Sequence, residues 1–230
     1  MPRVVASVTE SWAALPFGAQ VALEQQWQGV ATRALPCGSA VTDAAGEVIA
    51  SGRNRAYDEP GGADALQGTR IAHAELNAMA EVATTLDWVD LTLWSTQHPC
   101  AMCAAAAAFT GIGRVVYIAD DPSDDSSPGL MASSRRGIPY ESMGSSDWAT
   151  VSTLLFLTTG AYLHGHRDST IARAEGGGMG GAAGLALDLA AEDHLGRLSR
   201  AGYPLPDALE PLWPRITSLS TGNFKRGNQR

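Results

Sequence analysis

The sequence predicts an α/β fold, a three-layer α/β/α sandwich built around one mixed sheet. Helical and strand-like segments alternate over residues 18–119 in the order helix, hairpin, helix, strand, helix, strand. The last two strands are joined through a helix, which favours a parallel neighbour reached by a right-handed crossover. A hairpin and a parallel pair together make a mixed sheet, and helices are then expected to cover its two faces.

The first predicted elements are a helix and a hairpin. Apolar residues recur at helical spacing over residues 18–35, and Pro36 ends that helix. Two short β-like runs follow at residues 39–42 and 48–50, and the polar, glycine-containing loop between them indicates a hairpin. Residues 51–70 are rich in glycine and polar side chains, so we expect a loop there.

Two helices and two strands are predicted next. An apolar stripe predicts a helix over residues 72–86, and alternation predicts a strand over residues 91–96. Pro99 fits the first turn of the second helix, because its missing N–H is no loss there. That helix, residues 100–109, is rich in alanine, and a glycine-flanked turn separates it from a strand at residues 114–119 that we expect to be buried on both faces.

The pattern weakens after residue 120. Residues 120–137 are rich in Asp, Ser and Gly and indicate a surface loop, whereas residues 147–163 indicate a helix. Glycine-rich residues 175–181 are interpreted as a flexible connector, because a phosphate-binding loop would need a preceding strand and a following Lys-Ser/Thr. Residues 182–200 predict one amphipathic helix, beyond which four prolines break the pattern.

Composition limits the classes of function. Of the 230 residues, 45% are hydrophobic, and no apolar run approaches the about 20 residues that span a membrane. The start of the chain has no apolar signal region, and two of its three cysteines lie three residues apart, so we expect a cytoplasmic protein without a disulfide framework. The formal net charge of −8 disfavours RNA and DNA as partners. The basic pairs Arg135-Arg136 and Lys225-Arg226 are interpreted as solvated surface.

Two cysteines and one histidine are candidate metal ligands. Cys100 and Cys103 are three residues apart on a predicted helix, so their sulfurs fall on one face of its first turn, where ionised thiols are favoured. His73 begins the preceding helix and can supply a third ligand. A catalytic zinc site uses three protein ligands and keeps one position for water. The sequence therefore predicts Zn²⁺ held by His73, Cys100 and Cys103.

Glu75 is the candidate catalytic residue. It follows His73 by two residues, which moves its side chain off the ligand direction but keeps it beside the metal. Zinc lowers the pKa of a bound water towards about 7, and Glu75 can carry protons from that water to a ring nitrogen and a leaving amine. His-x-Glu followed by Pro-Cys-x-x-Cys is the signature of zinc deaminases, so we expect hydrolytic removal of an amino group from a heterocyclic base.

Three segments resemble the cytidine deaminase-like superfamily: residues 73–78 (HAELNA), 99–104 (PCAMCA) and 111–117 (GIGRVVY). They are most similar to its branch of guanine deaminases, transfer-RNA adenosine deaminases and cytosine deaminases. The resemblance covers residues 15–125 and implies a five-stranded mixed sheet, a bound Zn²⁺ ion and a homodimer. It leads us to divide the chain into a zinc deaminase core, residues 1–125, and a mostly helical C-terminal extension packing on it, residues 126–230.

The resemblance also implies contacts with the substrate. The backbone N–H of Ala74 is expected to help polarise the base, and Asn54 stands where the family has an asparagine that hydrogen-bonds the base or sugar. Many relatives carry Leu-Glu before Pro-Cys, whereas this chain has Gln97 and His98. We therefore expect His98 to lie close to the metal and to contact the substrate.

Several alternatives stay open on the sequence alone. Cys-x-x-Cys also occurs in redox pairs and in structural zinc sites, where His164 and His166 could complete the ligand set. The first functional hypothesis is deamination of a small purine or pyrimidine base or nucleoside. The others are a transfer-RNA adenosine deaminase, a deoxycytidylate-type nucleotide deaminase and a non-enzymatic module on the same fold. Trp148 and Tyr140 are candidates to close over the base by stacking.

Overall fold

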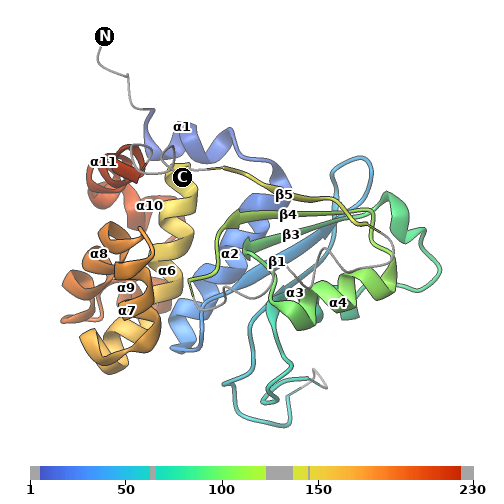
Figure 1. The fold of residues 1–230 in the computed structure, drawn as a ribbon, viewed down its shortest axis with the longest axis horizontal. Helices are drawn as coiled ribbons and strands as arrows, with labels where there is room; N and C mark the ends of the chain where they lie inside the picture. Colours follow the sequence, from blue (N-terminus) through green and yellow to red (C-terminus); the bar gives the residue numbers. More distant parts are fainter. Residues whose placement is uncertain (1–5, 63–65, 123–136, 145, 224–230) are drawn as a thin grey trace.

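The computed structural model describes residues 6–62, 66–122, 137–144 and 146–223. Its centre is a five-stranded sheet in the order β2-β1-β3-β4-β5 (Figure 1). The strands are β1 (Gly38–Thr42), β2 (Val48–Arg53), β3 (Thr92–Gln97), β4 (Arg114–Ala119) and β5 (Tyr140–Ser142). Strand β1 is antiparallel to β2 and β3, whereas β3, β4 and β5 run parallel. The predicted hairpin and parallel pair are therefore confirmed, and the sheet is mixed.

Helices cover both faces of the sheet, and further helices form the C-terminal half. They are α1 (Val8–Ala13), α2 (Phe17–Thr32), α3 (Ala74–Ala80), α4 (Ala101–Thr110), α6 (Asp147–His164), α7 (Ser169–Gly176), α8 (Gly180–Ala190), α9 (His194–Arg200), α10 (Leu205–Leu209) and α11 (Trp213–Asn223). Short 3₁₀ turns lie at Trp88–Asp90, Gly165–Arg167 and Glu210–Leu212. The predicted three-layer sandwich with a helical C-terminal region is confirmed.

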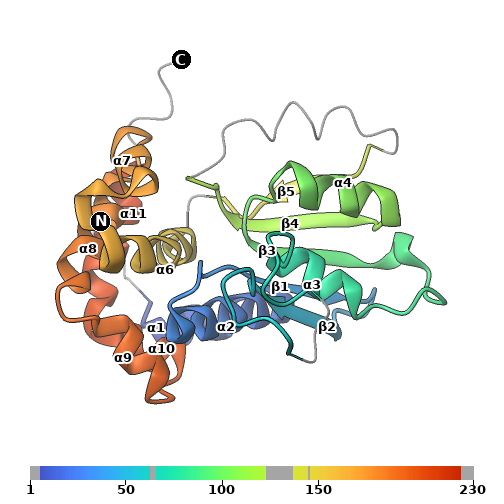
Figure 2. The same ribbon diagram turned by 90° about the horizontal axis from the view of Figure 1, so that it is seen from below.

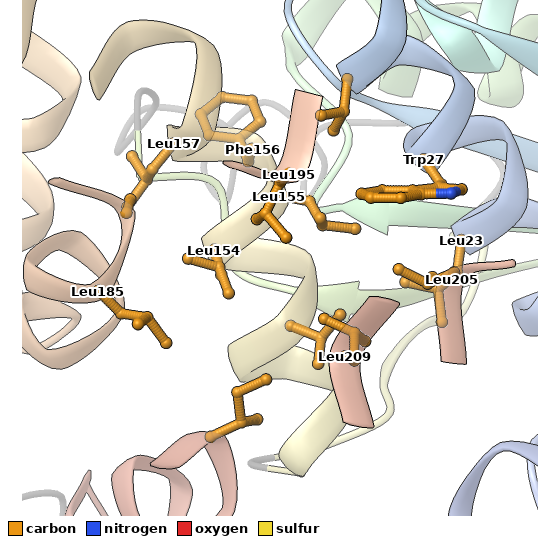
Figure 3. Close-up of a cluster of buried hydrophobic side chains, with 14 of the residues drawn as sticks. Leu23, Trp27, Leu154, Leu155, Phe156, Leu157, Leu185, Leu195, Leu205 and Leu209 are labelled. Atoms are coloured by element: carbon orange, nitrogen blue, oxygen red, sulfur yellow. The ribbon is translucent and has the colours of Figure 1, made fainter. Parts of the chain in front are cut away.

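The two faces of the sheet belong to two hydrophobic clusters. Val115 of β4 packs with Leu93 and with residues of α3 and α4. Ile118 of the same strand faces the other way and packs with residues of α2 and α6. This larger cluster continues into the C-terminal helices, with Leu185, Leu195, Leu205 and Leu209 among its side chains (Figure 3). These helices lie together at one side of the sheet (Figure 2). Helix α6 thus covers part of the sheet and also packs inside the helical half.

Helix α2 ends three residues before the predicted end. Arg33 adopts a left-handed conformation with φ 56° after the last helical residue, so the chain turns before Pro36 is reached. The helix lies tightly on β1, because a Cβ atom at Gly38 would meet the carbonyl oxygen of Ala22 at 2.0 Å. A glycine at this place allows the close approach of helix and strand.

Several predicted helix boundaries were wrong. The helix expected over residues 72–86 spans only Ala74–Ala80, and residues 81–86 form turns and loop. The single helix expected over residues 182–200 is two helices, α8 and α9, because Asp193 breaks the segment with φ 49°. The connector expected over residues 175–181 is shorter, since α7 reaches Gly176 and α8 begins at Gly180.

The C-terminal prolines lie at the beginnings of helices. Pro204 is the N-cap of α10, and Pro206 lies in its first turn. Proline is tolerated there because the first N–H groups of a helix have no partner within the helix. The prolines therefore interrupt the helical pattern after α9, as predicted, and a new helix begins directly after Pro204.

Two further expectations concern the loop after β4 and the absence of a membrane-spanning segment. The loop expected over residues 120–137 lies almost entirely outside the described residues. Among the residues that the structure does describe, none of the helices combines the length and the apolar character that crossing a membrane requires.

Candidate metal and catalytic site

The candidate site lies where α3 and α4 begin. His73 is the N-cap residue of α3 and Cys100 is the N-cap residue of α4, so both helices start at the site. The prediction that Pro99 lies in the first helical turn was wrong, because Pro99 precedes the N-cap residue Cys100. Ala-rich α4 ends at Gly111, which has φ 77° and supplies the left-handed C-cap.

The position of α3 depends on its close packing against β2. A Cβ atom at Gly52 would lie 2.7 Å from the backbone nitrogen of Ala78 and 2.9 Å from the carbonyl oxygen of Ala74. Asn77 adds a tether, since its Nδ2 donates to the carbonyl oxygen of Arg53 at 2.8 Å. The start of α3, and with it His73, is thereby held against the end of the hairpin.

The three predicted ligand side chains converge. His73 Nδ1 lies 3.6 Å from Cys100 Sγ and 3.6 Å from Cys103 Sγ, and the two sulfurs are 3.6 Å apart. They form a group that could hold a metal ion among the described residues, and this group does not include His164 or His166. The alternative in which those histidines complete a structural zinc site is therefore not favoured.

The spacing of these atoms fits a tetrahedral zinc ion. Zn–S bonds of about 2.3 Å and a Zn–N bond of about 2.0–2.1 Å place two sulfurs about 3.8 Å apart and a sulfur and a nitrogen about 3.6 Å apart. The observed separations of 3.6 Å agree closely with both values. Two thiols and an imidazole are also donor types that zinc prefers. The residues present fit Zn²⁺ as the cofactor.

The thiols differ in their readiness to ionise. Hydrogen bonds with Cys103 and with His73 lower the pKa of Cys100 to about 4, against the effect of burial. The hydrogen bond with Cys100, and then burial, raise the pKa of Cys103 well above its ordinary value. The hydrogen bond with Cys100 also raises the pKa of His73. One thiolate of the pair therefore forms readily, as a metal ligand requires.

Glu75 lies beside this group and is only 6% exposed. Its Oε2 accepts from Cys103 Sγ at 3.4 Å, and its Oε1 accepts from Ser95 Oγ at 3.1 Å. Burial is the main cause that raises the pKa of Glu75. The carboxyl group predicted to carry protons therefore adjoins the three ligand side chains, and it accepts a hydrogen bond from one of them, Cys103.

The predicted substrate contacts have different surroundings. Asn54 is buried, and its Oδ1 accepts from the backbone N–H of Ala56 at 2.9 Å, which is a turn-forming bond. Ala74 is the first residue of α3, so its backbone N–H has no acceptor within that helix. The ring of His98 packs edge-on against Tyr117, with ring centroids 4.7 Å apart. The backbone N–H of His98 donates to the carbonyl oxygen of Ala119.

The two aromatic candidates for closing over a base are separated by the structure. Trp148 is buried at 3% exposure in the helical half, between Trp12 and Trp213, and its Nε1 donates to Ser11 Oγ. It packs in the core and cannot stack on a base, so that hypothesis was wrong for Trp148. Tyr140 lies on the side of the sheet that carries the site, with its ring centroid 6.3 Å from that of His98.

Ser95 was missed by the sequence reasoning, whereas Tyr140 was named there as a candidate to close over the base. Ser95 contacts Glu75, and only the alternation of β3 could have indicated it, by placing Ser95 on the same face as Leu93. The hydroxyl of Tyr140 is buried, and it has no hydrogen-bond partner among the described residues. Burial, followed by the charges of Cys103 and Glu75, raises the pKa of Tyr140 to about 12.

Comparison with known proteins assigns the same segment to a family. Residues 17–119 match the family model for the cytidine and deoxycytidylate deaminase zinc-binding region. The chain is 36% identical over 109 residues to tRNA(Ile)-lysidine synthase of Deinococcus radiodurans, covering 46% of this chain and 17% of that protein. It is 28% identical over 101 residues to cytosine deaminase of Candida albicans, covering 43% of this chain and 62% of that protein. Each match thus spans less than two thirds of the relative.

Solved structures of similar proteins include a transfer-RNA deaminase that edits the wobble position, with a TM-score of 0.45 and 24% identity over 54% of this chain and 95% of that one. Another, solved in complex with 2,6-diaminopurine, has a TM-score of 0.45 and 20% identity over 70% of this chain and 85% of that one. The matched family model, together with the grouped His73, Cys100 and Cys103, supports zinc as the cofactor. Residues 17–119 of this chain match the zinc-binding region of cytidine and deoxycytidylate deaminases, and His73, Cys100 and Cys103 all lie within that segment.

Proposed function

We propose that this protein is a zinc-dependent hydrolytic deaminase that converts an amino group on a small purine or pyrimidine base or nucleoside to a carbonyl and releases ammonia. The observation that carries the proposal is the buried carboxyl group of Glu75 adjoining a histidine and two cysteines at the spacing of a zinc site. A structural site or a redox pair has no use for such a carboxyl group. Hydrolysis with proton transfer does have one.

His73, Cys100 and Cys103 are the proposed zinc ligands. When bound, zinc supplies a water of lowered pKa and a positive charge beside the reacting carbon. Three protein ligands would leave one coordination position of the metal for water or substrate, as in catalytic zinc sites. Cys100 enters this arrangement with a pKa of about 4, so little proton release is needed from that sulfur at neutral pH.

Glu75 is the proposed proton carrier. Its Oε2 faces Cys103, so the carboxyl group borders the place where the attacking water and the ring would meet. It takes one proton from the attacking water and places it on the ring nitrogen. It then takes the remaining proton from the new hydroxyl group and delivers it to the amino group as the carbon–nitrogen bond breaks and the carbonyl forms. The balance is one water consumed, one carbonyl formed and one ammonia released.

The proposed substrate contacts are Asn54, His98 and the backbone N–H of Ala74. The N–H of Ala74 is available at the start of α3, next to a ligand. The amide nitrogen of Asn54 can donate to the substrate while its oxygen is held by Ala56. His98 lies two residues before Cys100, with its ring supported by Tyr117. These three groups are the donors that would distinguish one base from another.

A small substrate is favoured by charge. The formal net charge is −8. Several arginines in the described part are engaged by acidic partners, as with Arg33 and Arg200 at Asp193 and Arg53 at Asp58. A phosphate backbone would be repelled on average. The basic pairs Arg135-Arg136 and Lys225-Arg226 lie outside the described residues.

Transfer RNA is the second candidate substrate, and one observation favours it. The most identical curated match named above is a segment of a protein that acts on tRNA by name. A deoxycytidylate substrate is the third candidate, since the matched family model includes deoxycytidylate deaminases.

We also propose a homodimer and the division into a core, residues 1–125, and an extension, residues 126–230. Light scattering of the purified protein tests the first, and limited proteolysis tests the second.

The experiment is an ammonia-release assay of the zinc-loaded protein. The panel contains aminopurine and aminopyrimidine bases, their nucleosides, deoxycytidylate and tRNA. We expect turnover of at least one base or nucleoside, with tRNA unchanged. Conversion of adenosine in tRNA, with salt-sensitive binding of the tRNA, would instead support transfer RNA as the substrate. A fully zinc-loaded protein that releases ammonia from none of these compounds would contradict the proposed function.

A further inference from the structure

The carboxyl group of Glu75 is held by a buried serine of the central strand β3. Ser95 Oγ donates to Glu75 Oε1 at 3.1 Å, and Ser95 is 1% exposed. Glu75 lies on α3, and Ser95 lies on the strand beneath it. A buried carboxyl group without a partner is costly, so this bond fixes where the side chain of Glu75 can rest.

The hydrogen bond at the other oxygen of Glu75 is incompatible with metal binding by Cys103. Cys103 Sγ donates to Glu75 Oε2 at 3.4 Å. A cysteine that binds a metal does so as a thiolate, which has no proton to donate. Of the two side-chain donors found at Glu75, only Ser95 can therefore keep its bond when the ligand set is occupied.

We propose that Ser95 is a positioning residue for deamination, an inference that rests on the proposed function. Its hydroxyl holds Oε1 of Glu75, and it thereby leaves Oε2 turned towards Cys103 and the ligand group, free to exchange protons. The hydroxyl of Ser95 bonds to Glu75 and is not among the hydrogen-bond partners of the three ligand atoms in the described part of the chain. Its effect is on the orientation of the proton carrier, which positioned general acid–base catalysis depends on.

A matched control lies on the neighbouring strand. Ser39 of β1 pairs directly with Ser95 in the sheet register and is fully buried. Its hydroxyl donates to the carbonyl oxygen of Trp94, at 2.6 Å, and not to Glu75. Ser39→Ala therefore removes a buried hydroxyl from the same part of the sheet without removing the contact to the carboxyl group.

The experiment compares Ser95→Ala, Ser95→Thr and Ser39→Ala as zinc-loaded enzymes. We expect Ser95→Ala to lower kcat about 10- to 100-fold, the usual effect of losing a supporting contact. KM and zinc affinity should change by less than about threefold, because neither substrate nor metal is touched. Ser95→Thr, which retains a hydroxyl, should restore most of kcat, and Ser39→Ala should leave it near that of the wild type.

A second readout does not depend on activity. Crystal structures of the wild type, Ser95→Ala and Ser95→Thr show where the carboxyl group of Glu75 rests. We expect it to be displaced in Ser95→Ala and retained in Ser95→Thr. If Ser95→Ala does not fold, Ser95→Cys replaces it, since a thiol is similar in shape and a weak donor.

The outcomes separate this inference from the proposed function. An active wild type whose kcat is unchanged in Ser95→Ala overturns the role of Ser95 and leaves the proposed function standing. A wild type that deaminates nothing contradicts the proposed function, and the position of Glu75 then decides the inference. A carboxyl group in the same place with and without the Ser95 hydroxyl overturns it, whereas a displaced one supports it.

Discussion

His73 and Cys103 lie 30 residues apart in the sequence, yet His73 Nδ1 is 3.6 Å from Cys103 Sγ. The fold brings them together because α3 and α4 lie on the same face of the sheet and begin at the same end of it. The ligand group thus depends on how two helices are seated on the strands. The predictions below test that seating, the metal, and the chemistry.

Removal of one proposed ligand should abolish tight zinc binding. We expect Cys103→Ser to weaken zinc affinity by more than about 100-fold, since the loss of supporting contacts alone costs 10- to 100-fold. Cys37→Ser is the matched control, because Cys37 is not in the described ligand group. Metal analysis measures the zinc content of the two variants, and competition with a chelator measures their zinc affinity. Equal zinc content in the two variants would contradict the assignment of Cys103.

The seating of α3 can be disturbed without touching a ligand. Gly52→Ala places a methyl group 2.7 Å from the backbone nitrogen of Ala78, so the helix must shift. We expect a loss of about 1–3 kcal/mol in the free energy of unfolding, together with weaker zinc binding. Gly184→Ala, in α8 where a Cβ meets nothing within 4 Å, should instead stabilise by about 0.5–1 kcal/mol. Denaturant titrations of both variants check the difference, and a destabilised Gly184→Ala would show that glycine substitution as such is responsible.

A buried polar network connects the helical half to the strand that precedes the cysteines. Ser152 of α6 donates to the carbonyl oxygen of Thr96 at 2.8 Å and accepts from Gln97 Nε2 at 2.9 Å. Ser152→Ala removes these bonds and the one that the hydroxyl donates to Gln26 Oε1, all of them buried, so we expect a cost of about 1–3 kcal/mol in the free energy of unfolding.

Urea unfolding measures this cost. Ser142→Ala, at an exposed position, serves as the control and should stay within about 0.5 kcal/mol of the wild type. Equal stability of the two variants would show that the contact of α6 with the end of β3 contributes little.

The link between α2 and α9 should depend on pH. Burial by itself raises the pKa of Asp193, but hydrogen bonds from Arg33 and Arg200 outweigh it and hold that pKa below its ordinary value. A carboxyl group with a lowered pKa in the folded state stabilises the protein above the pKa of the unfolded chain, about 3.9. This stabilisation is lost as the pH falls through the lower, folded value.

Asp193→Asn isolates that contribution. Asparagine tolerates the left-handed backbone at this position, so charge is the main change. We expect the variant to be less stable than the wild type at pH 7 by about 0.5–1 kcal/mol, with the difference shrinking below pH of about 4. Thermal unfolding at several pH values measures it. A difference that persists in strong acid would point to packing and not to the ion pairs.

The candidate site was more predictable than its surroundings. His73, Glu75, Cys100 and Cys103 occur in two short motifs whose spacing reflects the chemistry of a metal, so local sequence is sufficient to identify them. Ser95 has no such signature, because its contact with Glu75 exists only after α3 is packed on β3. Tyr140 and Trp148 looked equivalent as aromatic residues, and only the tertiary structure places one beside the site and the other in the core.

Fold prediction succeeded for the main elements of the sheet and failed at local exceptions. Helix α6 and strands β3 and β4 lie close to their predicted positions, at Asp147–His164, Thr92–Gln97 and Arg114–Ala119. Strand β5 has three residues, too few for alternation to be recognised, and it forms by pairing with β4. The break at Asp193 requires a left-handed residue that is not glycine, a conformation that propensity alone does not predict.

The most direct test of the account is ammonia release by the zinc-loaded wild type compared with Glu75→Gln. Glutamine keeps the size of the side chain and loses the ability to carry a proton. We predict that the variant retains the zinc content of the wild type and that its kcat falls by about 10²- to 10⁴-fold on the best base or nucleoside. A variant that deaminates that substrate as fast as the wild type, with zinc in both, would contradict the account.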